Sequence, residues 1–225
     1  MEESIHTHKI IPLVLPHQTL QYKFDILFAM ERAPKSENIL EQSYENALRL
    51  LYLKGVSDFV ELDERISKID FLKWLVEKKG FLLHGSNNQN IKMLEPRLAN
   101  CASKEFGNMN AVYAVEDPVL PTFYAIKDRR KFIGTAHSGY RSSTTHEGVT
   151  TKTYEFAVSK GLIESEPWSN GAVYIVARDT FRQGHNDEGE PIDEWASTAA
   201  VTPIGKIEIL TKDFPYLKDI KALEE

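Results

Sequence analysis

Hydrophobic residues recur at helical spacing in two segments of the first third of the chain. In the first segment, residues 35–55, apolar side chains lie three or four positions apart at Leu40, Tyr44, Ala47, Leu48 and Leu51. This is the spacing of one face of an α-helix. Ser36 has the side chain of an N-cap and Gly55 is a typical helix end, so the pattern predicts a helix between them.

A second helix is predicted in residues 63–80, where the apolar stripe consists of Ile66, Ile69, Leu72, Leu75 and Val76. Trp74 lies in the same segment, and we expect it to pack in the core. Two lysines followed by Gly80 are a typical helix end. Residues 1–79 are therefore interpreted as a mostly helical segment.

The pattern changes after Gly80 to short apolar runs with turn-rich segments between them. These runs predict one helix at 119–128 and strands at 81–84, 111–115, 152–158, 172–178, 194–201 and 205–210. The segments HSGYRSS (137–143) and RQGHNDEGEP (182–191) have the composition of loops. Unevenly spaced strands with few helices are typical of an antiparallel-rich α+β domain. We expect this domain over residues 80–213, followed by a C-terminal tail, 214–225.

Composition restricts the class of protein. The 225 residues are 42% hydrophobic with a net charge of −6, so the chain can bury a core and lacks the basic excess of a general nucleic-acid binder. Its basic cluster is interpreted as a solvated helix end, and consists of Lys127, Arg129, Arg130 and Lys131. The single cysteine, Cys101, excludes an internal disulfide and a cysteine-based zinc site, and we expect no metal. An acidic start and the lack of a long apolar run predict a cytoplasmic protein without a membrane span.

Candidate chemistry lies at the ends of predicted strands, because the sequence contains no P-loop, no dinucleotide-binding glycine motif, no zinc-protease motif and no nucleophile elbow. The first strand runs into His84, Gly85 and Ser86, a Gly/Asn-rich turn precedes Tyr113, and Glu194 opens a late strand. A glycine lets another molecule approach the backbone closely. The alternatives are a structural histidine, a core tyrosine and an edge carboxylate.

In their order, these residues resemble the ADP-ribosyltransferase fold, and within it the His-Tyr-Glu branch of diphtheria-toxin-like enzymes and poly(ADP-ribose) polymerases. The resemblance covers residues 81–210 and is carried by Leu-Leu-His-Gly-Ser, by Tyr-Ala after a Gly/Asn turn, and by a late strand that opens with Glu. It implies a split, antiparallel-rich β-sheet core. It also implies NAD as the ADP-ribose donor, without a metal, and a macromolecule or water as the acceptor.

The resemblance further implies how NAD would bind. His84 would hydrogen-bond a ribose hydroxyl, and the Gly85 backbone, next to Ser86, would pair with the nicotinamide carboxamide. Tyr113 and Tyr124 would enclose the nicotinamide ring, whose positive charge is attracted to aromatic faces.

The same resemblance gives Glu194 the catalytic role of stabilising the oxocarbenium-like centre that forms as nicotinamide departs. Arg97 is a candidate for the diphosphate, because arginine favours bidentate phosphate contacts. A structural ion pair with a nearby acid is the alternative for Arg97. Residues 98–110 would then cover the donor, and residues 179–193 would face an acceptor.

Two departures from the family pattern bear on the activity. Pro121 stands where the polymerases supply a serine hydroxyl to the carboxamide, so this contact is lost unless Thr122 replaces it. The arginine-modifying branch uses Glu-x-Glu, whereas Ile192 stands two residues before Glu194. Glu-Gly-Glu at 188–190 is interpreted as solvated charge.

Two other hypotheses stay open. One is a catalytically silent nucleotide- or protein-binding domain of the same fold. The other is an RNA 2′-phosphotransferase, against which the acidic pI of about 5.7 and the late glutamate argue.

Overall fold

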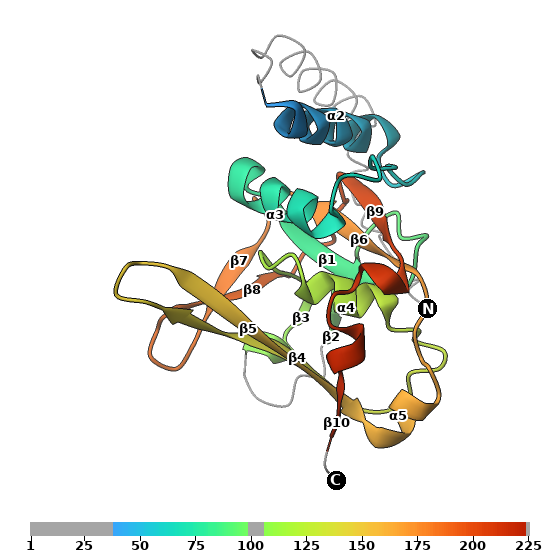
Figure 1. Ribbon diagram of the computed structural model, residues 1–225, viewed down its shortest axis with the longest axis vertical. Helices are drawn as coiled ribbons and strands as arrows, with labels where there is room; N and C mark the ends of the chain where they lie inside the picture. Colours follow the sequence, from blue (N-terminus) through green and yellow to red (C-terminus); the bar gives the residue numbers. More distant parts are fainter. Residues whose placement is uncertain (1–37, 99–105, 224–225) are drawn as a thin grey trace, which may run out of the picture. The chain divides into compact units, whose positions relative to one another are not determined.

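The chain divides into two units, residues 1–36 and 37–225. The computed structural model describes residues 38–98 and 106–223 (Figure 1). Ser36, Cys101 and residues 99–105 of the predicted covering segment lie outside this part. The helices of the second unit are α2 (Ile39–Lys54), α3 (Lys68–Lys79), α4 (Leu120–Ile126) and α5 (Lys160–Glu164). None of the described helices is long and apolar enough to cross a membrane.

Helix α2 confirms the first predicted helix. Asn38 caps it, because its side chain accepts a hydrogen bond from the Leu40 amide at 3.0 Å, and Gly55 ends it with a φ of 58°. Four of the five predicted stripe residues are buried, whereas Leu40 is 47% exposed. The stripe prediction was therefore wrong at Leu40, which lies in the first turn of the helix.

Helix α3 confirms the second predicted helix, but it begins later than the apolar pattern suggested. Ser67 is its N-cap, accepting a hydrogen bond from the Asp70 amide, and Gly80 ends it in the left-handed conformation. Trp74 is buried, as predicted, and its ring lies 5.5 Å from that of Tyr44 on α2 and 5.9 Å from that of Phe71. Aromatic packing therefore holds the two helices together.

The strands form three sheets with the orders β1-β6-β9, β10-β5-β4 and β2-β3-β8-β7. All pairings are antiparallel except that of β10 with β5. The bounds are β1 Leu82–Ser86, β2 Arg97–Leu98, β3 Asn110–Ala114, β4 Ala136–Thr144, β5 Thr150–Ser159, β6 Gly171–Val176, β7 Arg182–His185, β8 Pro191–Ser197, β9 Gly205–Ile209 and β10 Lys221–Leu223. The antiparallel-rich α+β class is thus confirmed.

Four local predictions were wrong. Residues 137–143 form part of β4 and not a loop, because β4 pairs with β5 along its whole length, and the ladder outweighs the turn-like composition. The segment predicted as a loop at 182–191, like the acceptor-facing segment 179–193, contains β7. Glu194 lies inside β8, which begins at Pro191, and β1 continues past His84 through Ser86.

Helix α4 packs against β1 and β6 at very short range. A Cβ atom at Gly85 on β1 would lie 1.9 Å from the carbonyl oxygen of Pro121, and one at Gly171 on β6 would lie 1.9 Å from that of Ala125. No side chain fits in either place. The glycine at position 85 is therefore required by the packing of α4, whatever binds beside it.

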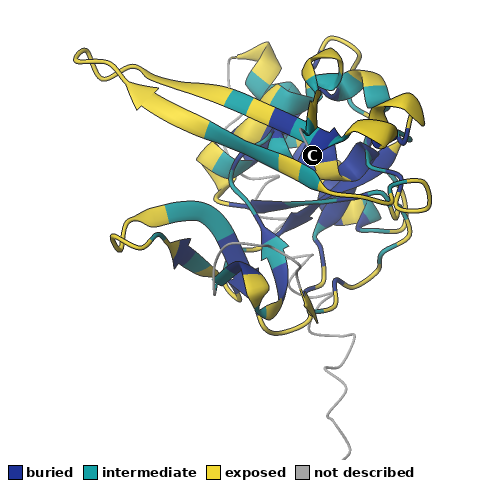
Figure 2. Cartoon of the chain, turned by 90° about the horizontal axis from the view of Figure 1, so that it is seen from below, coloured by how far each residue is buried: buried dark blue, intermediate teal, exposed yellow. Residues whose placement is uncertain are grey.

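The β4–β5 hairpin projects from the rest of the unit (Figures 1 and 2). Residues 141–153, around its turn, are exposed, whereas Tyr154 is half-buried and Phe156 is buried. At its base, Phe156 packs 4.8 Å from the ring of Phe214, which is 2% exposed, and β10 pairs with the end of β5. Residues 214–223 thus pack against the hairpin.

Candidate functional site

Strands β1 and β3 are joined at one residue pair and then separate. Leu83 and Val115 exchange both backbone hydrogen bonds, at 2.9 and 3.0 Å. In a continuous antiparallel ladder, the next such pair would be Gly85 and Tyr113. Instead, the Tyr113 carbonyl lies 2.7 Å from Nδ1 of His84, so an imidazole replaces the ladder bond.

This separation leaves the Gly85 backbone open on one edge. Backbone groups of residues two apart on a strand point to the same edge, so those of Gly85 point, like those of Leu83, away from β6. No described residue hydrogen-bonds to Gly85 on that edge. An N–H donor and a C=O acceptor therefore lie side by side, next to the His84 side chain.

The state of His84 follows from its partner. A carbonyl oxygen can only accept, so Nδ1 carries the hydrogen and donates to Tyr113. Burial lowers the pKa of the imidazole, and the positive charges of Arg129 and Arg97 lower it further, against the effect of the Tyr113 hydrogen bond. In the neutral form that results, Nε2 carries no hydrogen and can accept a hydrogen bond.

A cleft of about 290 Å³ lies beside this point and brings together several predicted residues. His84, Ser86, Arg97 and Tyr113 line it, together with Arg129, which the sequence analysis had placed in a solvated basic cluster. Gly85, Tyr124 and Glu194 are not among the lining residues.

The two predicted ring-binding tyrosines have different surroundings. The hydroxyl of Tyr113 lies 2.9 Å from the Phe106 carbonyl oxygen and 3.0 Å from that of Met109, so it holds the turn before β3. Tyr124 is 42% exposed on α4, and its hydroxyl lies 2.8 Å from Oγ of Ser138 on β4. The ammonium of Lys127 lies 5.3 Å from the centre of the Tyr124 ring.

Glu194 lies half-buried on β8, directly before Trp195, which pairs with Ala114 of β3. It follows that β3 lies between Glu194 and the strand that carries His84. Burial raises the pKa of the Glu194 carboxyl, and the negative charge of Asp193 raises it further.

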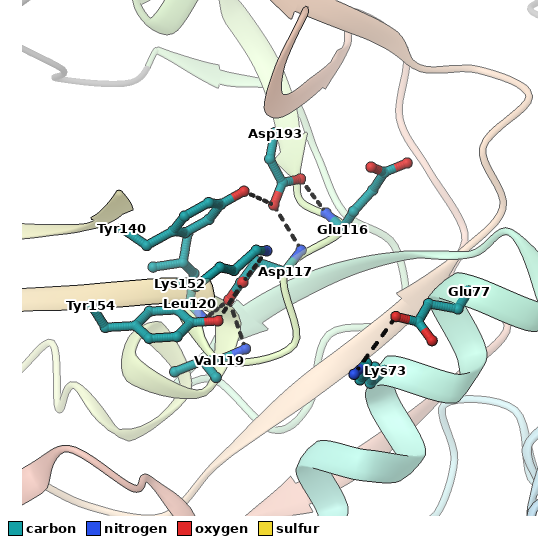
Figure 3. Close-up of polar contacts among 10 residues, drawn as sticks. All are labelled: Lys73, Glu77, Glu116, Asp117, Val119, Leu120, Tyr140, Lys152, Tyr154 and Asp193. Carbon is teal, nitrogen blue, oxygen red and sulfur yellow. Dashed lines mark hydrogen bonds and ion pairs between the residues drawn. The ribbon is translucent and has the colours of Figure 1, made fainter. Parts of the chain in front are cut away.

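Asp193 belongs to a polar cluster that the sequence analysis missed (Figure 3). Its carboxylate accepts hydrogen bonds from the backbone amides of Glu116 and Asp117, and from the Tyr140 hydroxyl at 3.2 Å. Burial raises the pKa of Asp193 despite these bonds. The strand that carries Glu194 is thereby tied to the segment between β3 and α4.

Asp117 is the centre of the same cluster and is 1% exposed. One carboxylate oxygen accepts from the amides of Val119 and Leu120, at 2.9 and 3.0 Å, and so caps the start of α4. The other accepts from the Lys152 ammonium and the Tyr154 hydroxyl, both at 2.7 Å. An Asp shortly before a predicted helix was a readable signal for the first role. The sequence around Lys152 and Tyr154, on the hairpin, contains no local pattern that predicts their contact with Asp117.

The hydroxyl of Thr122, the residue named above as the alternative to a serine at position 121, makes a hydrogen bond at the start of α4. Thr122 is fully buried, and its Oγ1 donates to the Val119 carbonyl at 2.6 Å. The hydrogen of the Thr122 hydroxyl is therefore already used within the protein.

Among residues 38–98 and 106–223, no three His, Cys, Asp or Glu side chains converge in a way that could hold a metal ion. Comparisons of the chain with protein-family models, curated proteins and solved structures found no match.

Proposed function

We propose that this chain is an NAD-dependent ADP-ribosyltransferase, which acts as an NAD glycohydrolase when water is the acceptor. The observation that carries the proposal is the open backbone edge of Gly85 beside a neutral His84. A primary carboxamide presents an acceptor and a donor side by side, which complements the N–H and C=O of one strand residue. The nicotinamide carboxamide has this pattern, and the unprotonated Nε2 of His84 would accept from a ribose hydroxyl.

The proposed reaction breaks the bond between C1′ of the nicotinamide ribose and the pyridinium nitrogen. The bonding electron pair leaves with nicotinamide, which becomes neutral, and positive charge develops on C1′ and the ring oxygen. A hydroxyl, amine or water of the acceptor then bonds to C1′ and releases a proton. Ionised Glu194 would stabilise the positive charge as it forms.

In this proposal, the reacting ribose would lie close enough to contact both the open edge of β1 at Gly85 and the Glu194 carboxyl on β8. Asp193 supports this assignment, because its hydrogen bonds to the amides of Glu116 and Asp117 hold β8 against the segment between β3 and α4. Glu194 is the next residue on β8, so its backbone position is restrained.

The test is release of free nicotinamide from NAD, followed by one-dimensional proton NMR. We expect release by the wild type and by Glu190→Gln, and none by Glu194→Gln. Glu190 is a matched control because it is exposed and lies four residues away in the same region. Unchanged turnover in Glu194→Gln would refute the catalytic role of this carboxylate, and wild-type protein that neither binds nor consumes NAD would refute the function.

A second candidate is a nucleotide-binding domain of the same fold without catalysis. It is favoured by the commitment of the Thr122 hydroxyl to Val119 and by the position of Glu194 outside the cleft. Saturable NAD binding without nicotinamide release over many hours would support this function.

A further inference from the structure

The cleft beside His84 has a positively charged side formed by two arginines. Arg97, at the start of β2, and Arg129, three residues after the end of α4, both line it. They lie in segments that are separated in sequence and are brought to one cleft by the fold. Both side chains are exposed.

Neither guanidinium is neutralised by a described carboxylate. The adjacent Arg130 pairs with Asp128 at 3.1 Å, whereas no ion pair joins Arg97 or Arg129 to another described residue. One carboxylate, Glu95, also lines the cleft. The cleft therefore carries two positive charges against one negative charge, next to an imidazole that these arginines help to keep neutral.

The remaining lining is largely apolar and includes Ile91, Met93, Leu94 and Val112. A ligand that fills this cleft thus needs an apolar body and an anionic group directed at two arginines. Arginine is suited to phosphate oxygens because its planar fork donates two parallel hydrogen bonds. A nucleoside diphosphate has both parts.

We infer that Arg97 and Arg129 together form a diphosphate-binding clamp, with Arg129 as the residue that sequence motifs do not reveal. The inference rests on the proposed function for the identity of the whole ligand, because the diphosphate would belong to NAD. The clamp orients the ligand so that its diphosphate lies toward β2 and the end of α4, while its amide end lies toward Gly85.

The experiment is isothermal titration calorimetry of the full chain with ADP, adenosine and inorganic diphosphate. We expect ADP to bind at least about tenfold more tightly than adenosine, since each charge-assisted contact supplies roughly that factor. Arg97→Gln and Arg129→Gln should each weaken ADP binding about tenfold, and leave adenosine binding unchanged. Arg182→Gln, on β7, is the matched control, because Arg182 is exposed and does not line the cleft.

The outcomes separate this inference from the proposed function. Equal binding of ADP and adenosine, or ADP binding by Arg129→Gln that equals the wild type, overturns the clamp even when NAD is consumed. Loss of ADP binding in both arginine variants supports the clamp even when no nicotinamide is released. If ADP does not bind the wild type, the clamp is overturned.

Discussion

Replacing Gly85 with alanine tests whether this glycine is required by the fold. The added Cβ would lie 1.9 Å from the carbonyl oxygen of Pro121, 2.7 Å from its carbonyl carbon and 2.8 Å from its Cα. Contacts below 3.0 Å are essentially never adopted by real Cβ atoms, so the α4 backbone would have to move by at least 1.1 Å (3.0 minus 1.9). Backbone atoms cannot relieve such a clash by rotating a side chain.

We expect Gly85→Ala to lower the free energy of unfolding by about 3 kcal/mol, at the upper end of the usual cost of overpacking. For a domain of this size, the midpoint of thermal unfolding would fall by roughly 6–12 °C. Calorimetry without any ligand measures this, with Gly139→Ala on β4 as the control, because no atom lies within 4 Å of a Cβ there. If Gly85→Ala were as stable as Gly139→Ala, the conclusion that the packing of α4 requires this glycine would be refuted. Ligand binding would then be the remaining reason for a glycine at position 85.

Two further predictions concern the polar cluster. Asp117→Asn should lower the free energy of unfolding by about 2–4 kcal/mol, because it leaves the Lys152 ammonium without its counter-charge. Urea denaturation should show this loss, whereas Glu155→Gln, which removes an exposed pair of 3.5 Å with Arg141, should cost less than about 0.5 kcal/mol; equal effects would contradict the central role of Asp117. Because burial and the Asp193 charge raise the pKa of Glu194, NAD cleavage should decline with falling pH at a higher pH than an ordinary glutamate would cause. Asp193→Asn removes the second cause, so the acid limb of kcat/KM should move to lower pH, and a shift in the opposite direction would refute the assignment.

Hydrophobic periodicity was sufficient to predict the helices whose own sequence contains an apolar face and capping residues. Both long helices have an apolar face with caps, and their ends at Gly55 and Gly80 were correctly predicted. Strand β4 was missed because His137, Ser138 and Gly139 resemble a turn, and what makes them a strand is the ladder with β5. Such pairing energy is a property of two segments, and neither segment shows it alone.

The same distinction, between local sequence signals and contacts distant in sequence, applies to the residues of the candidate site. Tyr113 and His84 were predicted from short motifs, and the hydrogen bond between the Tyr113 carbonyl and the imidazole brings them together. Arg129 and Asp193 were not predicted as candidate site residues, because their surroundings are formed by residues far away in the chain. Asp193 bonds to amides at positions 116 and 117, and no local composition indicates a contact over that distance.

The strand order also has a consequence for how the molecule is made. Leu82 pairs with Val176 and Val112 pairs with Ser197. The strands β1 and β3, which flank the cleft, therefore pair with strands that are synthesised much later. Among the described strands, β2–β3, β4–β5 and β7–β8 pair with the next strand in the chain, whereas β1–β6 and β3–β8 join strands that are far apart in sequence. Such long loop closures slow folding, and on the ribosome the cleft would be completed only after β6 and β8 had been synthesised. Until then, β1 would have an unpaired apolar edge, for which a chaperone could compete with the native sheet.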